Sequence, residues 1–136
     1  NFTYYIQALS WSMPVFAASL AVGLMGANVL IVNNYRDADD DQVTGKRTLA
    51  VRFGAGKTIM LYRLNAIAGA LLSIPGWLAT GRLTLIFPIL YLFAALAIAR
   101  ALGRRKGAAI NPLLGMTAVS MAAYWLLFVI IAATRV

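Results

Sequence analysis

The chain of 136 residues contains no cysteine, no histidine and no glutamate. Without cysteine there is neither a disulfide framework nor a thiolate metal site. Without histidine the chain lacks the side chain most often used as a general base and as a zinc or haem ligand. Any chemistry must therefore use carboxylates, amides, hydroxyls, lysine and arginine.

Charged residues are also scarce, at 12% of the chain, whereas soluble domains usually carry about 25%. The mean hydropathy is +0.79, and long segments carry no charge at all. This composition is typical of a membrane protein. The net charge of +8 does not indicate a nucleic-acid partner, because the basic residues flank apolar segments instead of forming one stripe.

Four apolar segments are each long enough to cross a membrane as a helix. The first, from Met13 to Val32, has twenty residues without a charge, which is enough to cross about 30 Å of hydrocarbon. The fold class predicted from these segments is all-α, a polytopic membrane helical bundle with about four transmembrane helices. We expect the other three spans at about 58–80, at 83 to 99 or 102, and at about 111–134.

Two polar loops carry most of the basic residues. Loop 33–57 holds five and loop 100–110 holds four, whereas Arg82 and Arg135 are the basic residues expected at the opposite side. By the positive-inside rule, we expect both basic loops to face the cytoplasm. The uncharged segment 1–12, which contains tyrosines and a tryptophan, is typical of a membrane interface.

A few polar and small residues within the spans predict helix contacts. Asn28 and Asn65 are each expected to form an interhelical hydrogen bond. Asn111 is placed to cap the fourth helix, with Pro112 at its first position. Small residues spaced four apart allow helices to approach closely. These pairs are Ala17 and Ala21, Gly23 and Ala27, Ala66 and Ala70, Ala95 and Ala99, and Ala118 and Ala122.

All four acidic residues of the chain fall within one five-residue window, at Asp37, Asp39, Asp40 and Asp41. If the first membrane helix continues past residue 32, then Asn33, Asp37 and Asp41 share one helical face. Carboxylates on one face repel each other, and near a helix C-terminus the helix dipole adds to the repulsion. We therefore expect a compensating cation at this place.

An all-oxygen set of ligands favours a hard divalent cation such as Mg²⁺, which is commonly held by one or two carboxylates together with phosphate oxygens. Lys46 and Arg47 follow closely and supply charge complementary to a phosphate. Gly45 permits a turn that brings them back over the acids. The residues predict a metal-bridged phosphate site, with Asp37 and Asp41 on its face. The alternative is a solvated acidic loop between two helices.

The run from Asn33 to Gly54, NNYRDADDDQVTGKRTLAVRFG, closely resembles the second aspartate-rich motif of the UbiA-type membrane prenyltransferases. Its form, NNxRDxxxDxxxGKxTLAVxxG, looks most like that of the 1,4-dihydroxy-2-naphthoate polyprenyltransferases of menaquinone synthesis. The resemblance implies that residues 1–136 form the C-terminal half of a nine-helix bundle in a bacterial inner membrane. The earlier aspartate-rich motif of the family is missing, so we expect the chain alone to be inactive.

The resemblance also implies an activity, the Mg²⁺-dependent transfer of a polyprenyl group from an allylic diphosphate to dihydroxynaphthoate within the lipid bilayer. Carried onto this sequence, Asp37 and Asp41 would bind Mg²⁺ bridged to the polyprenyl diphosphate. Asn33 and Asp40 would support that cluster, Asp40 as a further metal-binding residue and Asn33 as a further diphosphate-binding residue. The basic residues that would bind and neutralise the diphosphate are Arg36, Lys46 and Arg47.

Two alternatives stay open. The first is another member of the same superfamily, with a 4-hydroxybenzoate or chlorophyllide-like acceptor. The second is a four-helix membrane module that binds a divalent cation, or scaffolds a partner, without catalysis.

Overall fold

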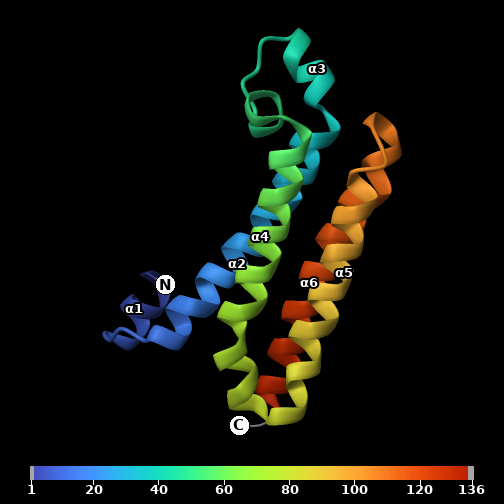
Figure 1. Ribbon diagram of the computed structural model, residues 1–136. Coiled ribbons are helices and arrows are strands. Elements are labelled where there is room, and N and C mark those ends of the chain that lie inside the picture. The colour runs from blue at the N-terminus through green and yellow to red at the C-terminus, as the bar shows by residue number, and fades with distance from the viewer. Residues whose placement is uncertain (1, 135–136) are drawn as a thin grey trace.

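The computed structural model describes residues 2–134, which are built from helices and short connections (Figure 1). The long helices are α2 (Met13–Arg36), α4 (Leu49–Thr80), α5 (Ile86–Leu102) and α6 (Asn111–Ala133). The short ones are α1 (Phe2–Ala8), α3 (Ala38–Val43), η1 (Arg82–Leu85) and η2 (Gly107–Ile110). Four helical stretches are long and apolar enough to span a membrane, at Met13–Arg36, Leu49–Thr80, Arg82–Leu102 and Gly107–Ala133. The prediction of an all-α bundle with about four such helices is confirmed.

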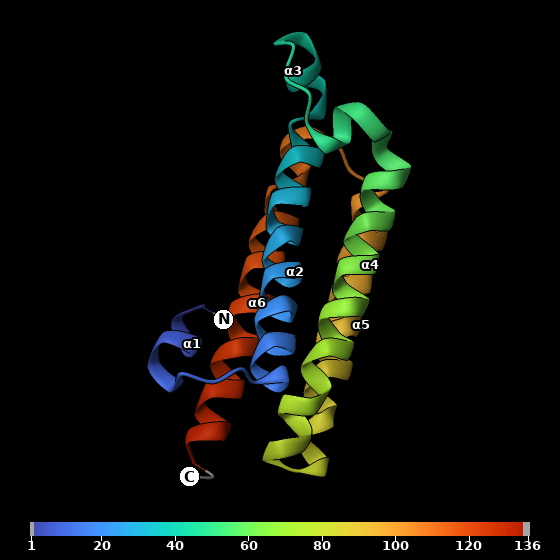
Figure 2. The same cartoon turned by 90° about the vertical axis from the view of Figure 1, so that its left-hand side faces the viewer.

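The long helices run side by side (Figures 1 and 2), with α2 packed mainly against α4, α4 against α5, and α6 against both α2 and α5. The helix α3, the start of α4 and the loop between α5 and α6 all lie at one end of the bundle. The 3-10 helix η1, which begins at Arg82, lies at the other end. Both basic loops therefore share one end, as the charge pattern predicts. Arg135 lies outside the described residues.

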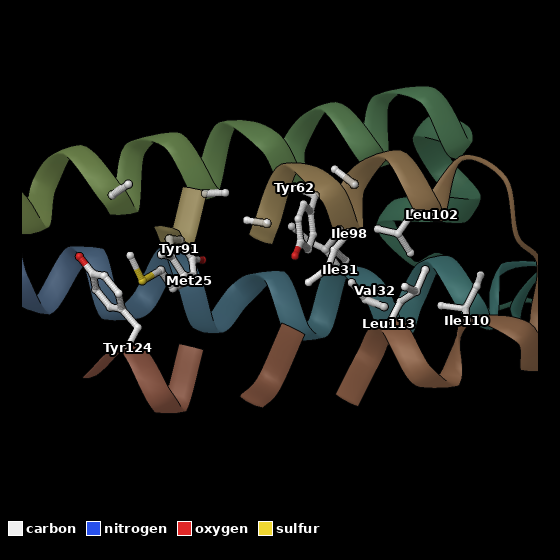
Figure 3. Close-up of a cluster of buried hydrophobic side chains, with 14 of the residues drawn as sticks. Met25, Ile31, Val32, Tyr62, Tyr91, Ile98, Leu102, Ile110, Leu113 and Tyr124 are labelled. Atoms are coloured by element: carbon white, nitrogen blue, oxygen red, sulfur yellow. The ribbon is translucent and has the colours of Figure 1, made fainter. Parts of the chain in front are cut away.

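Buried side chains from every long helix fill the space between them (Figure 3). The polar group Asn28 is also fully buried, and its Nδ2 donates to the carbonyl of Tyr62 at 3.1 Å. The predicted interhelical hydrogen bond of Asn28 is thus confirmed, and it joins α2 to α4. The same prediction for Asn65 is wrong, because its half-buried side chain forms no hydrogen bond within residues 2–134. The labelled members of the cluster are Met25, Ile31, Val32, Tyr62, Tyr91, Ile98, Leu102, Ile110, Leu113 and Tyr124.

Small residues set the spacing between α2 and α4. The predicted pair Ala66 and Ala70 is buried. The tightest approach is at Gly69, where an added Cβ would lie 2.9 Å from Cγ of Met25 and 3.4 Å from the carbonyl oxygen of Ala21. Not every four-residue spacing marks a contact. The pair on α5 is buried, whereas Gly23 and Ala122 are exposed.

The prediction that Asn111 caps the fourth helix is wrong. Asn111 is itself the first residue of α6, with helical φ of −49° and ψ of −44°, and Ile110 occupies the cap position without a capping hydrogen bond from its side chain. Pro112 lies in the first turn, where a missing N–H costs no intrahelical hydrogen bond. The side-chain oxygen of Asn111 instead accepts a hydrogen bond from Arg36.

Candidate functional site

The acidic window lies where α2 ends and α3 begins. The helix α2 ends at Arg36, and Asp37 interrupts it with φ of −93° and ψ of 6° before α3 starts. Backbone hydrogen bonds continue across the interruption, because the N–H of Asp37 donates to the carbonyl of Asn33 at 3.1 Å and that of Asp41 donates to the carbonyl of Asp37 at 2.8 Å. Asn33, Asp37 and Asp41 are therefore joined by hydrogen bonds between residues four apart, as helical spacing predicts, although the helix itself is interrupted at Asp37.

Arg36 is the centre of the side-chain contacts at this junction. Its Nε donates to Oδ1 of Asp37 at 2.7 Å, and its Nη2 donates to Oδ2 of the same carboxylate at 2.9 Å. Its Nη2 also donates to Oδ1 of Asn33 at 2.9 Å, and its Nη1 donates to Oδ1 of Asn111 at 3.1 Å. A guanidinium that grips both oxygens of a carboxylate forms the strongest kind of hydrogen-bonded ion pair. The cation facing Asp37 in this structure is therefore Arg36.

The hydrogen bonds from Arg36 hold the pKa of Asp37 below the usual value for an aspartate. Partial burial of the carboxyl acts in the opposite direction, and the charges of Arg36 and Lys46 add to the lowering. Since the charged form is the favoured one, Asp37 is ionised at neutral pH. An ionised carboxylate is the form that a metal cation requires.

Replacing Arg36 with glutamine is expected to raise the pKa of Asp37 towards its ordinary value, because the guanidinium no longer stabilises the charged form. As the pH falls, Asp37 then takes up its proton at a higher pH than in the native chain. The measurement is a pH titration of aspartate side-chain ¹³C signals in detergent without metal. The chain has four aspartates and no glutamate, so the spectrum is simple, and loss of one signal in Asp37→Asn assigns it. An unchanged titration midpoint in Arg36→Gln would contradict the ion pair.

Asp41 lies on the other side of the junction and is 5% exposed. Its Oδ1 is 3.2 Å from Nζ of Lys46, and its carbonyl accepts from the N–H of Lys46 at 2.9 Å. Gly45 makes this return possible with a φ of 74°, a left-handed conformation that costs glycine little. The predicted turn at Gly45 is confirmed for Lys46. Arg47 is exposed, and within residues 2–134 its side chain forms no hydrogen bond or ion pair.

Two hollows flank Arg36, and both reach the loop between α5 and α6. Asp40 is exposed and lines the same hollow as Asp37, whereas Asp39 is exposed and lines the other. The first hollow, of about 310 Å³, is lined by Arg36, Asp37, Asp40, Gly107, Ala108 and Asn111. The second, of about 250 Å³, is lined by Tyr35, Arg36, Ala38, Asp39, Gln42, Ala50, Val51, Gly54, Ala55, Lys106 and Gly107.

The sequence does not predict that the loop between α5 and α6 contributes to this site. Its basic residues were assigned to membrane topology, yet Lys106 lines the second hollow beside Arg36. Asn111 was assigned to helix capping, yet it binds Arg36, which lies 75 positions earlier. No local pattern carries that information, because the contact exists only when α6 packs against α2.

Comparison with known proteins connects this geometry to a family. Residues 1–109 match the UbiA prenyltransferase family. The chain belongs to the UbiA prenyltransferase family. The family predicted from the aspartate-rich run is thus confirmed, and the matched region includes α2, α3, α4 and α5.

Curated relatives of this UbiA family chain carry one name. It is 44% identical over 70 residues to the 1,4-dihydroxy-2-naphthoate octaprenyltransferase of Mycobacterium tuberculosis, a match covering 51% of this chain and 24% of that protein. It is also 44% identical over 55 residues to the Haemophilus influenzae protein of the same name, covering 40% of this chain and 18% of the relative. These matches span about a quarter or less of the relatives' lengths. No solved structure matches the chain significantly.

UbiA family enzymes generally use Mg²⁺. The side chains at this junction that could hold such an ion are its aspartates. Among residues 2–134, no three Asp, Glu, His or Cys side chains gather where they could jointly hold a metal. Asp37 and Asp40 line one hollow, whereas Asp41 faces Lys46. Mg²⁺ often takes only one or two carboxylates, with waters and substrate phosphate oxygens completing its shell. The oxygen-only groups of this junction fit that mode of binding.

Proposed function

We propose that the full-length protein transfers a polyprenyl group from an allylic diphosphate to 1,4-dihydroxy-2-naphthoate, as a Mg²⁺-dependent membrane enzyme of menaquinone biosynthesis. The observation that carries the proposal is the hollow at one end of an apolar helical bundle, where Asp37 and Asp40 lie beside Arg36 and Asn111. Membership of the UbiA prenyltransferase family supports the reaction type. The shared name of the curated relatives supports the acceptor.

On this proposal Asp37 and Asp41 hold the metal, and Asp40 supports them from the same hollow as Asp37. When bound, Mg²⁺ neutralises charge on the diphosphate oxygens. Lys46 and Arg47 bind the diphosphate, Lys46 by exchanging its contact with Asp41 and Arg47 from solvent. Arg36 keeps the carboxylate of Asp37 ionised and oriented. Its four hydrogen bonds leave one N–H of the guanidinium, and this N–H binds the diphosphate.

The reaction then needs charge stabilisation more than proton transfer. The allylic C–O bond breaks, and its electron pair leaves with the diphosphate, where the basic side chains stabilise the developing charge. The electron-rich ring attacks the allylic cation at the carbon that carries the carboxylate and forms the new C–C bond. The carboxylate then leaves as CO₂, and its bonding electron pair restores the aromatic ring. A phenolic ring needs little help from a base, which agrees with a chain that has no histidine.

The membrane placement follows from the same charges. Both basic loops share the end that carries the aspartates, so we place that end at the cytoplasmic face of a bacterial inner membrane. We expect apolar side chains of the complete bundle to shield the allylic cation from water. In this proposal, the aspartates of this chain form one of the two aspartate-rich clusters of the active site. The earlier aspartate-rich motif of the family forms the other.

The proposal is tested with membranes that contain the full-length protein, a labelled polyprenyl diphosphate and either dihydroxynaphthoate or 4-hydroxybenzoate. We expect prenylated naphthoquinol only with dihydroxynaphthoate, and its loss when EDTA removes divalent metal. Restoration by added Mg²⁺ is the matching control. Product with 4-hydroxybenzoate instead would assign a different acceptor. No product with either acceptor, while Mg²⁺ still binds, would favour the non-catalytic membrane module.

A further inference from the structure

We infer that Asn111, at the start of α6, is a positioning residue for the aspartate-rich site, because it fixes Arg36 and through it the carboxylate of Asp37. The inference rests on the proposed function, in which Asp37 binds the metal and diphosphate. It adds a residue from a distant part of the chain that neither the motif nor its spacing contains.

The hydrogen bonds of Arg36 show how the orientation is transmitted. One edge of the guanidinium, formed by Nε and Nη2, donates to both oxygens of Asp37 at 2.7 and 2.9 Å. The opposite corner, Nη1, donates to Oδ1 of Asn111 at 3.1 Å. A guanidinium is planar and rigid. Fixing Nη1 therefore also sets the plane of the edge that Asp37 meets.

The side chain of Asn111 has no other evident role in the fold. It does not cap α6, since its backbone is already helical and Ile110 occupies the cap position. It is exposed and lines the hollow that also contains Asp37 and Asp40. An exposed amide in the first turn of a helix contributes little packing, so what it provides is one acceptor oxygen aimed at Arg36.

This arrangement links three elements at the site. Asn33 belongs to α2, Asp37 to the junction before α3, and Asn111 to α6, and all three accept hydrogen bonds from Arg36. The start of α6 therefore helps to orient the carboxylate of Asp37 through Arg36. Removing such outer support of a metal ligand typically costs about 10- to 100-fold in activity or metal affinity.

The test uses two variants of matched size in the full-length protein. Asn111→Leu removes the acceptor oxygen, and Asn111→Gln keeps a neutral amide oxygen on a side chain of about the same size as leucine. We expect Asn111→Leu to lower kcat/KM for the polyprenyl diphosphate by about 10-fold or more, with the KM for the aromatic acceptor unchanged. Asn111→Gln should stay closer to the native protein. Equal losses in both variants, or native activity in Asn111→Leu, would overturn the inference.

A double-mutant cycle asks whether Asn111 acts through Arg36. If it does, Arg36→Gln combined with Asn111→Leu loses no more activity than Arg36→Gln alone. Losses that multiply would show an independent role and would overturn the inference.

A failure of the proposed function is seen separately, because the native full-length protein would then show no turnover at all. In that case the ¹³C signal of Asp37 in metal-free detergent still reports the positioning. It should move in Asn111→Leu and stay near its native position in Asn111→Gln, and an unmoved signal in Asn111→Leu would overturn the inference.

Discussion

Replacing Asp37 with asparagine in the full-length protein is expected to lower prenyl transfer by at least about 100-fold, the usual cost of removing one preorganised electrostatic group. The amide keeps the shape of the side chain but carries no charge for the metal. It also replaces one acceptor oxygen of the bidentate pair with an N–H₂ donor, which faces the donors of Arg36. The measurement is turnover of labelled polyprenyl diphosphate at saturating Mg²⁺, normalised to folded protein.

Neighbouring aspartates supply the controls for this prediction. Asp39→Asn makes the same chemical change two residues away, at a side chain that lies in the other hollow, and we expect it to retain activity within a few-fold. Native turnover in Asp37→Asn would refute the assignment of Asp37. The motif predicts a greater loss from Asp41→Asn than from Asp40→Asn. The reverse order would place the second ligand in the hollow that Asp37 and Asp40 share.

The parts of this site that the sequence predicts are those set by local geometry. Asn33, Asp37 and Asp41 are linked by i to i+4 backbone hydrogen bonds, which the helical spacing alone anticipates. Lys46 returns to Asp41 because Gly45 accepts a positive φ, and glycine at that position is visible in the sequence. Short-range periodicity and turn chemistry suffice for both features.

The parts that the sequence does not predict depend on which helices pack together. The resemblance implies that Arg36 binds the diphosphate, but its guanidinium is largely engaged with Asp37, Asn33 and Asn111. A dipeptide of asparagine and proline is a reasonable helix-start signal, and nothing near Asn111 in the sequence indicates a partner on α2. The close approach at Gly69 is not predictable from the sequence for the same reason, since it depends on Met25 of the facing helix.

Trp77 holds the opposite end of the bundle together. It is fully buried near the end of α4, and its Nε1 donates to the hydroxyl of Tyr124 on α6. Its ring stacks on Phe87 of α5 with centroids 4.8 Å apart, and it meets the edge of Phe128 at 5.1 Å. Its carbonyl also accepts from the hydroxyl of Thr84 at 2.7 Å. One side chain therefore contacts two neighbouring helices, and its backbone anchors the turn before α5.

Trp77→Ala is accordingly expected to lower the free energy of unfolding by about 3–5 kcal/mol, the usual cost of removing a buried tryptophan from a packed core. The substitution leaves a cavity lined by Phe87 of α5 and by Tyr124 and Phe128 of α6, and these rigid rings cannot fill it. The measurement is reversible unfolding of the chain in mixed micelles with increasing SDS, followed by circular dichroism. Trp77→Phe should lose less, because it keeps most of the ring contacts and gives up the hydrogen bond, worth about 1 kcal/mol.

Trp11 is the matched control, because the same substitution there removes a tryptophan that is 63% exposed. Its ring contact is with Tyr5 at 5.7 Å between centroids, outside the main bundle. We expect Trp11→Ala to change the free energy of unfolding by no more than about 0.5 kcal/mol. If Trp77→Ala proved as mild as Trp11→Ala, the contacts between α4, α5 and α6 would not stabilise this end, and the cohesion of the bundle would come from α2 and α4 alone.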